Sequence, residues 1–154
     1  MMRPREPHDR TLHAVERLEL LESVWRTCPW RPREAIAVGL RQWLRCAGDA
    51  LREDQAIDLP SRAVDEAWHG LILGTARYAA FCGDAYGRFL HHNPERDGNS
   101  SAEALARTVI AWTHVRRPGE KGVLWNLDAV VGVPAPWGVS AERVAQIEAQ
   151  VAGT

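Results

Sequence analysis

Apolar residues recur every three or four positions along most of the chain, which is the spacing of helices with one buried face. In the N-terminal third this spacing predicts a helix over residues 9–25 and a second helix over residues 33–51. The predicted faces contain Leu12, Val15, Leu18, Leu21 and Trp25 in the first helix, and Ile36, Leu40, Trp43, Leu44, Ala47 and Leu51 in the second. The proline-containing segment 28–32 separates the two, because proline interrupts helices.

The middle of the chain predicts a long third helix over residues 61–82, with Ser61 as its N-cap. Its apolar positions fall on one face of a helical projection. They are Val64, Trp68, Leu71, Ile72, Thr75, Tyr78, Ala79 and Cys82. Gly83 and Gly87 are expected to kink or restart the helix before the chain leaves it at residues 91–94.

Three shorter helices are expected in the remainder. Ser100 and Glu103 have the spacing of a capping box at the start of a helix over residues 100–114. An apolar stretch predicts a short helix over 123–131, and Ser140 is expected to cap a final helix. Because no alternating strand pattern is present, the expected fold is all-α, a compact bundle of five or six helices in a single domain spanning residues 1–154.

Composition limits the classes of function. Apolar residues make up 45% and charged residues 25% of the 154 residues, and the net charge is −1. This near-neutral charge gives no general attraction to nucleic acid or to an anionic membrane. No run of 18 apolar residues is present, and residues 1–10 lack the apolar core of a signal peptide. The three cysteines are widely spaced, which argues against a disulfide framework, so a cytoplasmic protein is expected.

Groups that bind metals or transfer protons concentrate between residues 65 and 92. This histidine segment contains Asp65, His69, His91 and His92. Asp65 and His69 are one helical turn apart, so the carboxylate can orient the imidazole or bind a metal with it. Three imidazoles and a carboxylate suit Zn(II) or Fe(II), so these four residues are the predicted metal ligands.

Each of these residues also has a simpler interpretation. Asp65 and His69 are equally explained as a solvated pair on the helix surface. A charged histidine at position 91 or 92 would also suit the negative end of a helix. Cys82 is expected to be a buried, unreactive thiol, because it lies in the middle of the apolar face.

Residues 61–94 resemble the glycine-rich domain-containing protein-like family of plants and bacteria. The residues shared with the family motif are Asp65, Trp68, His69, Leu73, Thr75, Tyr78, Cys82, Gly87, Phe89, Leu90, His91, His92 and Pro94. Leu71 and Gly74 stand where the family has a second histidine and an aspartate. The resemblance implies a helical domain without a defined reaction. It also implies fewer ligands here for any metal that the family binds.

Two functional hypotheses follow from the sequence. The first is a metal-binding helical protein with no assigned catalytic residue, one form of which is a metal-dependent enzyme using the histidine cluster. The second is a non-catalytic interaction module with structural histidines, in which exposed Trp30 or Trp137 anchors a partner. A small molecule or a peptide is the expected partner, with a protein or a peptide as the partner of the interaction module, and the oligomeric state is left open.

Overall fold

The computed structural model describes residues 6–92 and 101–153, and all regular secondary structure in these two stretches is helical. The elements are α1 (Glu6–Arg17), η2 (Glu22–Thr27), α2 (Arg33–Leu51), α3 (Arg62–Leu73), α4 (Thr75–Tyr86), α5 (Ala102–Val115), η4 (Leu124–Asn126), α6 (Leu127–Val130) and α7 (Ala141–Ala152), where η marks a 3-10 helix. The all-α prediction is confirmed, and the described residues contain more helices than the five or six expected.

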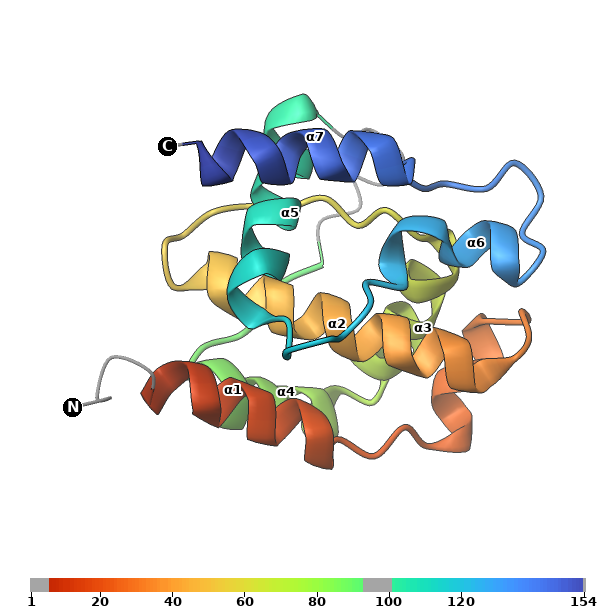
Figure 1. The fold of residues 1–154 in the computed structure, drawn as a ribbon. Coiled ribbons are helices and arrows are strands. Elements are labelled where there is room, and N and C mark those ends of the chain that lie inside the picture. The colour runs from red at the N-terminus through yellow and green to blue at the C-terminus, as the bar shows by residue number, and fades with distance from the viewer. Residues whose placement is uncertain (1–5, 93–100, 154) are drawn as a thin grey trace.

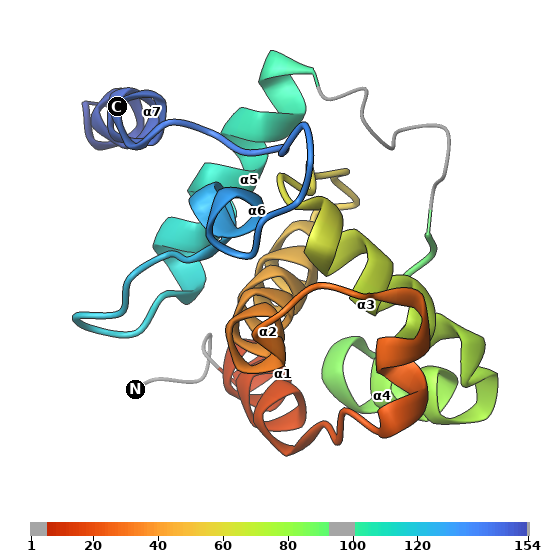
Figure 2. The same ribbon diagram turned by 90° about the vertical axis from the view of Figure 1, so that its right-hand side faces the viewer.

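Helix α2 crosses the middle of the molecule (Figure 1). Most of its residues from Gly39 to Ala50 are buried, because other helices pack around it on several sides. Turning the molecule by 90° shows α1, α3 and α4 on one side of α2 and α5, α6 and α7 on the other (Figure 2). Helix α7 packs on α5 and makes the outer edge of this second group.

The first predicted helix is interrupted. Helix α1 ends at Arg17, and the chain continues through residues 18–21 to the separate 3-10 helix η2. Leu21 has an extended backbone, with φ −70° and ψ 162°. The leucines at 18, 20 and 21 remain partly buried against the core, so the apolar spacing continues although the helix does not. Spacing alone therefore could not reveal the break.

The third predicted helix is also two helices, α3 and α4. Gly74 separates them with φ −81° and ψ 69°, which lies outside the helical region. Tyr78 and Cys82 are still fully buried after the break, whereas Ala79 is exposed. Helix α4 continues through Gly83 and ends at Tyr86. Gly87 caps it with a φ of 71°, the left-handed conformation typical of helix ends.

The helix caps follow the predictions with one exception. The side chains of Ser61 and Ser140 accept hydrogen bonds from the third residue after each, at 3.1 Å, as expected for N-caps. Helix α5 is capped by Ser101, whose hydroxyl accepts from the amide of Ala104 at 3.0 Å. The predicted capping residue Ser100 and the loop turn at Pro94 lie outside the described residues.

Asp128 joins α3, α6 and the loop before α7. Its carboxylate is fully buried and accepts four hydrogen bonds. The donors are the hydroxyl of Ser61 at 2.8 Å and the backbone amides of Arg62 at 2.8 Å, Ala63 at 3.0 Å and Trp137 at 3.0 Å. The partial positive charge at the N-terminus of α3 is thereby balanced by the carboxylate of a residue far away in the sequence.

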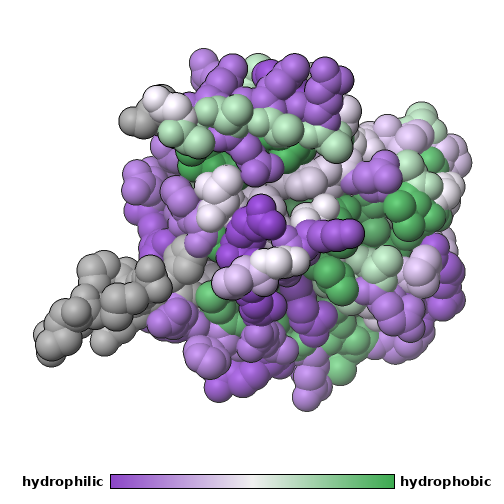
Figure 3. Space-filling model, viewed as in Figure 1, coloured by the Kyte–Doolittle hydropathy of each residue, from purple (hydrophilic) through white to green (hydrophobic). Residues whose placement is uncertain are grey.

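No helix in the described stretches is long and apolar enough to cross a lipid bilayer. The surface face in Figure 3 is largely polar, and its hydrophobic atoms gather toward the side where α6 lies. Val130, at the end of α6, is one of few large apolar side chains that are mostly exposed.

Candidate functional site

The histidine segment brings Asp65 and His92 together. His92 follows α4 in the chain, and its Nε2 lies 3.2 Å from Oδ1 of Asp65 on α3. Both side chains are largely buried. The imidazole ring also packs on Trp68, with ring centroids 4.7 Å apart. A contact between Asp65 and His69 was expected, but the histidine that contacts Asp65 is His92.

The other two predicted ligands are placed differently. His69 is exposed, and its ring centroid lies 6.1 Å from that of His92. His91 is exposed and packs on Phe89 at 4.7 Å. Within residues 6–92 and 101–153 there is no group of three or more histidine, cysteine or acidic side chains placed to hold a metal ion. The assignment of Asp65, His69, His91 and His92 as metal ligands therefore stays a prediction.

A chain of hydrogen bonds fixes the segment after α4. The indole of Trp68 donates to the hydroxyl of Tyr78 at 3.1 Å, and that hydroxyl donates to the carbonyl oxygen of Leu90 at 2.6 Å. Cys82 is fully buried beneath them, as predicted. Burial raises the pKa of its thiol, although hydrogen bonds with Leu90 and Tyr78 oppose this. A protonated buried thiol is a poor nucleophile, so Cys82 is part of the core.

A cavity of ≈ 330 Å³ lies beside the histidine segment. We call it the aromatic cavity, because five rings contribute to its wall. They are Trp43, Trp68, Phe89, His91 and Trp137. The wall is formed by the C-terminal half of α2, the loop at 54–59 and the segment at 88–91, together with Trp68 on α3 and Trp137.

Two aspartates contribute to the aromatic cavity in different ways. Asp54 is exposed and pairs with Arg88 at 2.7 Å. Asp58 is half-buried, and burial raises the pKa of its carboxyl, an effect partly offset by a hydrogen bond from the amide of Leu59. No ion pair joins Asp58 to any residue of the two described stretches. The cavity therefore contains one carboxylate without a neutralising cation in the described chain.

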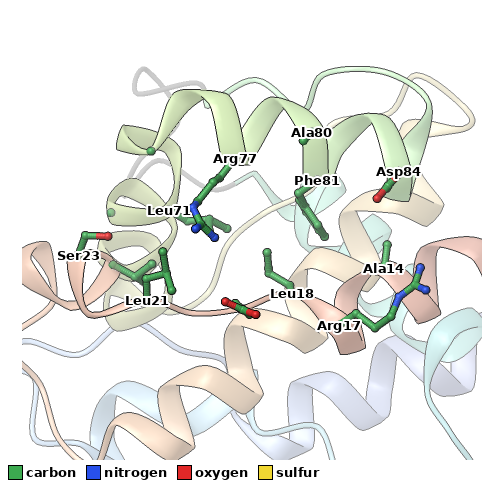
Figure 4. Close-up of a pocket in the computed structure, with 14 residues that line it drawn as sticks. Ala14, Arg17, Leu18, Leu21, Ser23, Leu71, Arg77, Ala80, Phe81 and Asp84 are labelled. Atoms are coloured by element: carbon green, nitrogen blue, oxygen red, sulfur yellow. The ribbon is translucent and has the colours of Figure 1, made fainter.

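A larger groove of ≈ 460 Å³ lies between α1, the 18–24 segment and α3–α4. Leu18, Leu21 and Phe81 form its apolar part, and Arg77 and Arg17 lie toward opposite ends (Figure 4). The charged residues at its margin are Arg17, Glu19, Arg77 and Asp84, all of them exposed. Two positive and two negative exposed groups give the groove no single chemistry for selecting a ligand. None of the four predicted ligands, Asp65, His69, His91 and His92, lines it, so its size does not make it the better candidate.

The tryptophans proposed as exposed anchors differ from that expectation. Trp30 is half-buried, and its indole donates to a carboxylate oxygen of Glu66 at 2.6 Å, which fixes it against α3. Trp137 is half-buried as well and lines the aromatic cavity. Sequence reasoning missed Asp58, since an aspartate in a polar stretch carries no signal of burial. The high number of tryptophans, seven in the chain, was the available sign of an aromatic wall.

Comparison with known proteins gives one informative result. No curated protein and no solved structure matches the chain significantly. One family model, described as UCP032817-like, matches residues 15–116, which is about two thirds of the chain. This match overturns the resemblance to the glycine-rich domain-containing protein-like family, which rested on a motif within residues 61–94. The chain belongs to the UCP032817-like family, whose description names no activity.

Proposed function

We propose that this protein is a helical binding protein that takes a small organic molecule in the aromatic cavity. One observation carries the proposal: three of the seven tryptophans line this cavity together with Phe89 and His91. Its volume of ≈ 330 Å³ is within the usual range of ligand sites, which are mostly apolar with a few polar groups. Asp58 supplies such a polar group.

Hydrogen bonds that hold the cavity wall in place support the same proposal. Trp68 is fixed through Tyr78, and the carbonyl of Leu90 is held by that tyrosine. The indole of Trp43 donates to the backbone oxygen of Asp58 at 3.1 Å. A wall that is already ordered loses little conformational freedom when a ligand binds, which favours affinity.

Screening of small organic fragments by NMR tests the proposal. We expect fragments that bind to shift the indole N–H signals of Trp43, Trp68 and Trp137. The substitution Trp137→Ala should weaken binding about tenfold, because it removes a half-buried wall residue. Trp30→Ala is the matched control, since Trp30 is also half-buried but lies outside the cavity.

Two outcomes would contradict the proposal. One is a screen in which no fragment shifts the three indole signals. The other is an equal loss of affinity in Trp137→Ala and Trp30→Ala, which would place binding elsewhere or attribute the loss to a general change in the fold. Melting temperatures of both variants separate these effects.

Metal binding at the histidine segment is the second candidate. The contact between Asp65 and His92 favours it, with His69 as the next imidazole. Two contacting side chains are fewer than the four ligands of an ordinary structural zinc site. Elemental analysis of untagged protein kept free of chelators tests this candidate for Zn(II) and Fe(II). Stoichiometric metal in the wild type that disappears in His92→Ala, but not in His114→Ala, would establish it, and metal-free wild type would reject it.

We also propose that the protein is cytoplasmic. Cys28, Cys46 and Cys82 are all free and buried. Unpaired thiols of this kind are typical of proteins in reducing compartments.

A further inference from the structure

We infer that the aromatic cavity selects an organic cation, such as a quaternary or protonated amine, and that Asp58 provides the opposing charge. This inference rests on the proposed function and adds the chemical class of the ligand. Its basis is a half-buried carboxylate that has no ion pair in the described chain and that shares a cavity with five aromatic rings.

The backbone of Asp58 is held firmly at the edge of α5. Its amide donates to the hydroxyl of Thr108 at 2.8 Å, and its carbonyl oxygen accepts from that hydroxyl at 3.0 Å and from the indole of Trp43 at 3.1 Å. These contacts use only backbone atoms of Asp58. They fix its position, and the carboxylate, which accepts from the amide of Leu59, keeps further acceptor sites for a ligand.

The aromatic rings of the wall suit a cation. The indole N–H groups of Trp43 and Trp68 are already bound, to Asp58 and to Tyr78 respectively. These two tryptophans therefore have no hydrogen-bond donor left for a ligand. Their rings pack on each other, with centroids 4.5 Å apart, so each contributes to the cavity only the ring carbons that line it. The face of an indole ring attracts a cation through its quadrupole, most strongly where water is excluded.

The remaining charges do not cancel that of Asp58. Arg88 is paired with Asp54 at 2.7 Å and also donates to the carbonyl of Leu51. Arg107 approaches the same loop, but it donates to the carbonyl oxygen of Ala56 at 2.7 Å and forms no ion pair with Asp58. An anionic ligand would be repelled by Asp58, and a neutral ligand would leave its half-buried charge with the amide of Leu59 and no counter-charge, which is unfavourable.

Two probes of nearly equal shape test the inference. Choline carries a quaternary ammonium group, and 3,3-dimethyl-1-butanol replaces it with a neutral tert-butyl group. Isothermal titration calorimetry with the wild-type protein should show choline binding at least about tenfold more tightly than the alcohol. The substitution Asp58→Asn should remove most of this preference, because the amide keeps the acceptor oxygen but loses the charge.

The control variant is Asp84→Asn, which removes an exposed carboxylate from the other groove. It should keep the preference for choline. If Asp58→Asn unfolds, Trp137→Ala provides a second test, since the loss of an aromatic ring should weaken choline binding more than binding of the neutral alcohol and so reduce the preference. A preserved preference in Asp58→Asn would overturn the role of Asp58.

The outcomes distinguish this inference from the proposed function. If the alcohol binds as tightly as choline, the cation class is wrong while a small-molecule cavity stands. If choline fails to bind but neutral fragments shift the indole signals of the cavity, the inference is again wrong and the proposed function survives. If no fragment and neither probe binds, both are wrong.

Discussion

Asp128 shows how a single buried residue can connect three segments. Its carboxylate accepts one hydroxyl and three backbone amides, two of them in the first turn of α3. Backbone donors at a helix N-terminus carry partial positive charge, so a carboxylate satisfies them better than water would in the interior. The short apolar stretch around residue 128 predicted a helix, but it held no sign that this aspartate points inward.

We expect Asp128→Ala to destabilise the protein by roughly 3–5 kcal/mol, because it leaves two buried and two partly buried donors without an acceptor. Asp128→Asn should cost less, since one acceptor oxygen remains. Urea unfolding followed by circular dichroism measures both. Asp84→Ala is the control on an exposed aspartate and should change stability by less than about 0.5 kcal/mol. A similar small effect of Asp128→Ala would mean that water replaces the lost carboxylate.

At the scale of elements, the apolar pattern predicted that the elements are helices and where they lie. It did not predict where a helix is interrupted. Helix α2 was predicted with its observed bounds, because proline precedes it and a polar stretch follows it. The breaks at 18–21 and at Gly74 were missed. In both places the apolar residues stay in step with a helical face while the backbone leaves it. Only the packing of η2 against α3 and of α1 against α4 explains why the chain turns there.

Gly70 is the contact point between α3 and η2, and it gives a prediction at this scale. A Cβ atom at position 70 would overlap the carbonyl oxygen of Val24 and lie 2.6 Å from the hydroxyl of Thr27. Alanine normally stabilises a helix by about 1 kcal/mol relative to glycine. Here the clash with backbone outweighs that gain, so Gly70→Ala should lower stability by roughly 1–3 kcal/mol.

Gly83→Ala is the matched control, because position 83 is also helical and a Cβ atom there would have no packing neighbour within 4 Å. It should raise stability by about 0.5–1 kcal/mol. Thermal melting of the two variants should therefore move in opposite directions. If both variants gain stability, α3 and η2 are not in close contact.

At the scale of the whole molecule, the site depends on partners that the sequence separates widely. The density of histidines drew attention to the segment at 65–92, where His92 rather than His69 meets Asp65. The aromatic cavity collects residues from α2, from the 54–59 loop and from position 137. No local spacing connects these stretches, because their proximity is created by α2 packing against its neighbours. The aromatic cavity could therefore not be predicted from the sequence, although Trp68 and residues 88–91 of its wall belong to the histidine segment.

The loop at 116–122 is also held in place by residues that are distant in the sequence, although its charged sequence suggests mobility. Glu120 ties this loop to the core. Its carboxylate accepts from the nearly fully buried Arg45 at 2.6 Å, from Gln42 at 3.2 Å and from the amide of Arg117 at 3.0 Å. Burial by itself would raise the pKa of Glu120, but these hydrogen bonds and the charge of Arg45 lower it below its ordinary value of 4.5.

The lowered pKa determines how stability should change with pH. A carboxyl whose pKa is lower in the folded state stabilises the protein above its unfolded value of 4.5, and this contribution is lost as pH falls further. Near pH 7, Glu120→Gln should cost roughly 3 kcal/mol, because the buried Arg45 loses its counter-charge. As pH falls below 4.5, the wild type loses the same interaction, so the difference between the two proteins should shrink. Urea unfolding near pH 7 and below pH 4.5 measures the difference in stability between wild type and Glu120→Gln. Glu53→Gln, at an exposed position, is the control. A difference that stays constant with pH would show that Glu120 acts through its shape and hydrogen bonds, and that its charge does not hold the loop to α2.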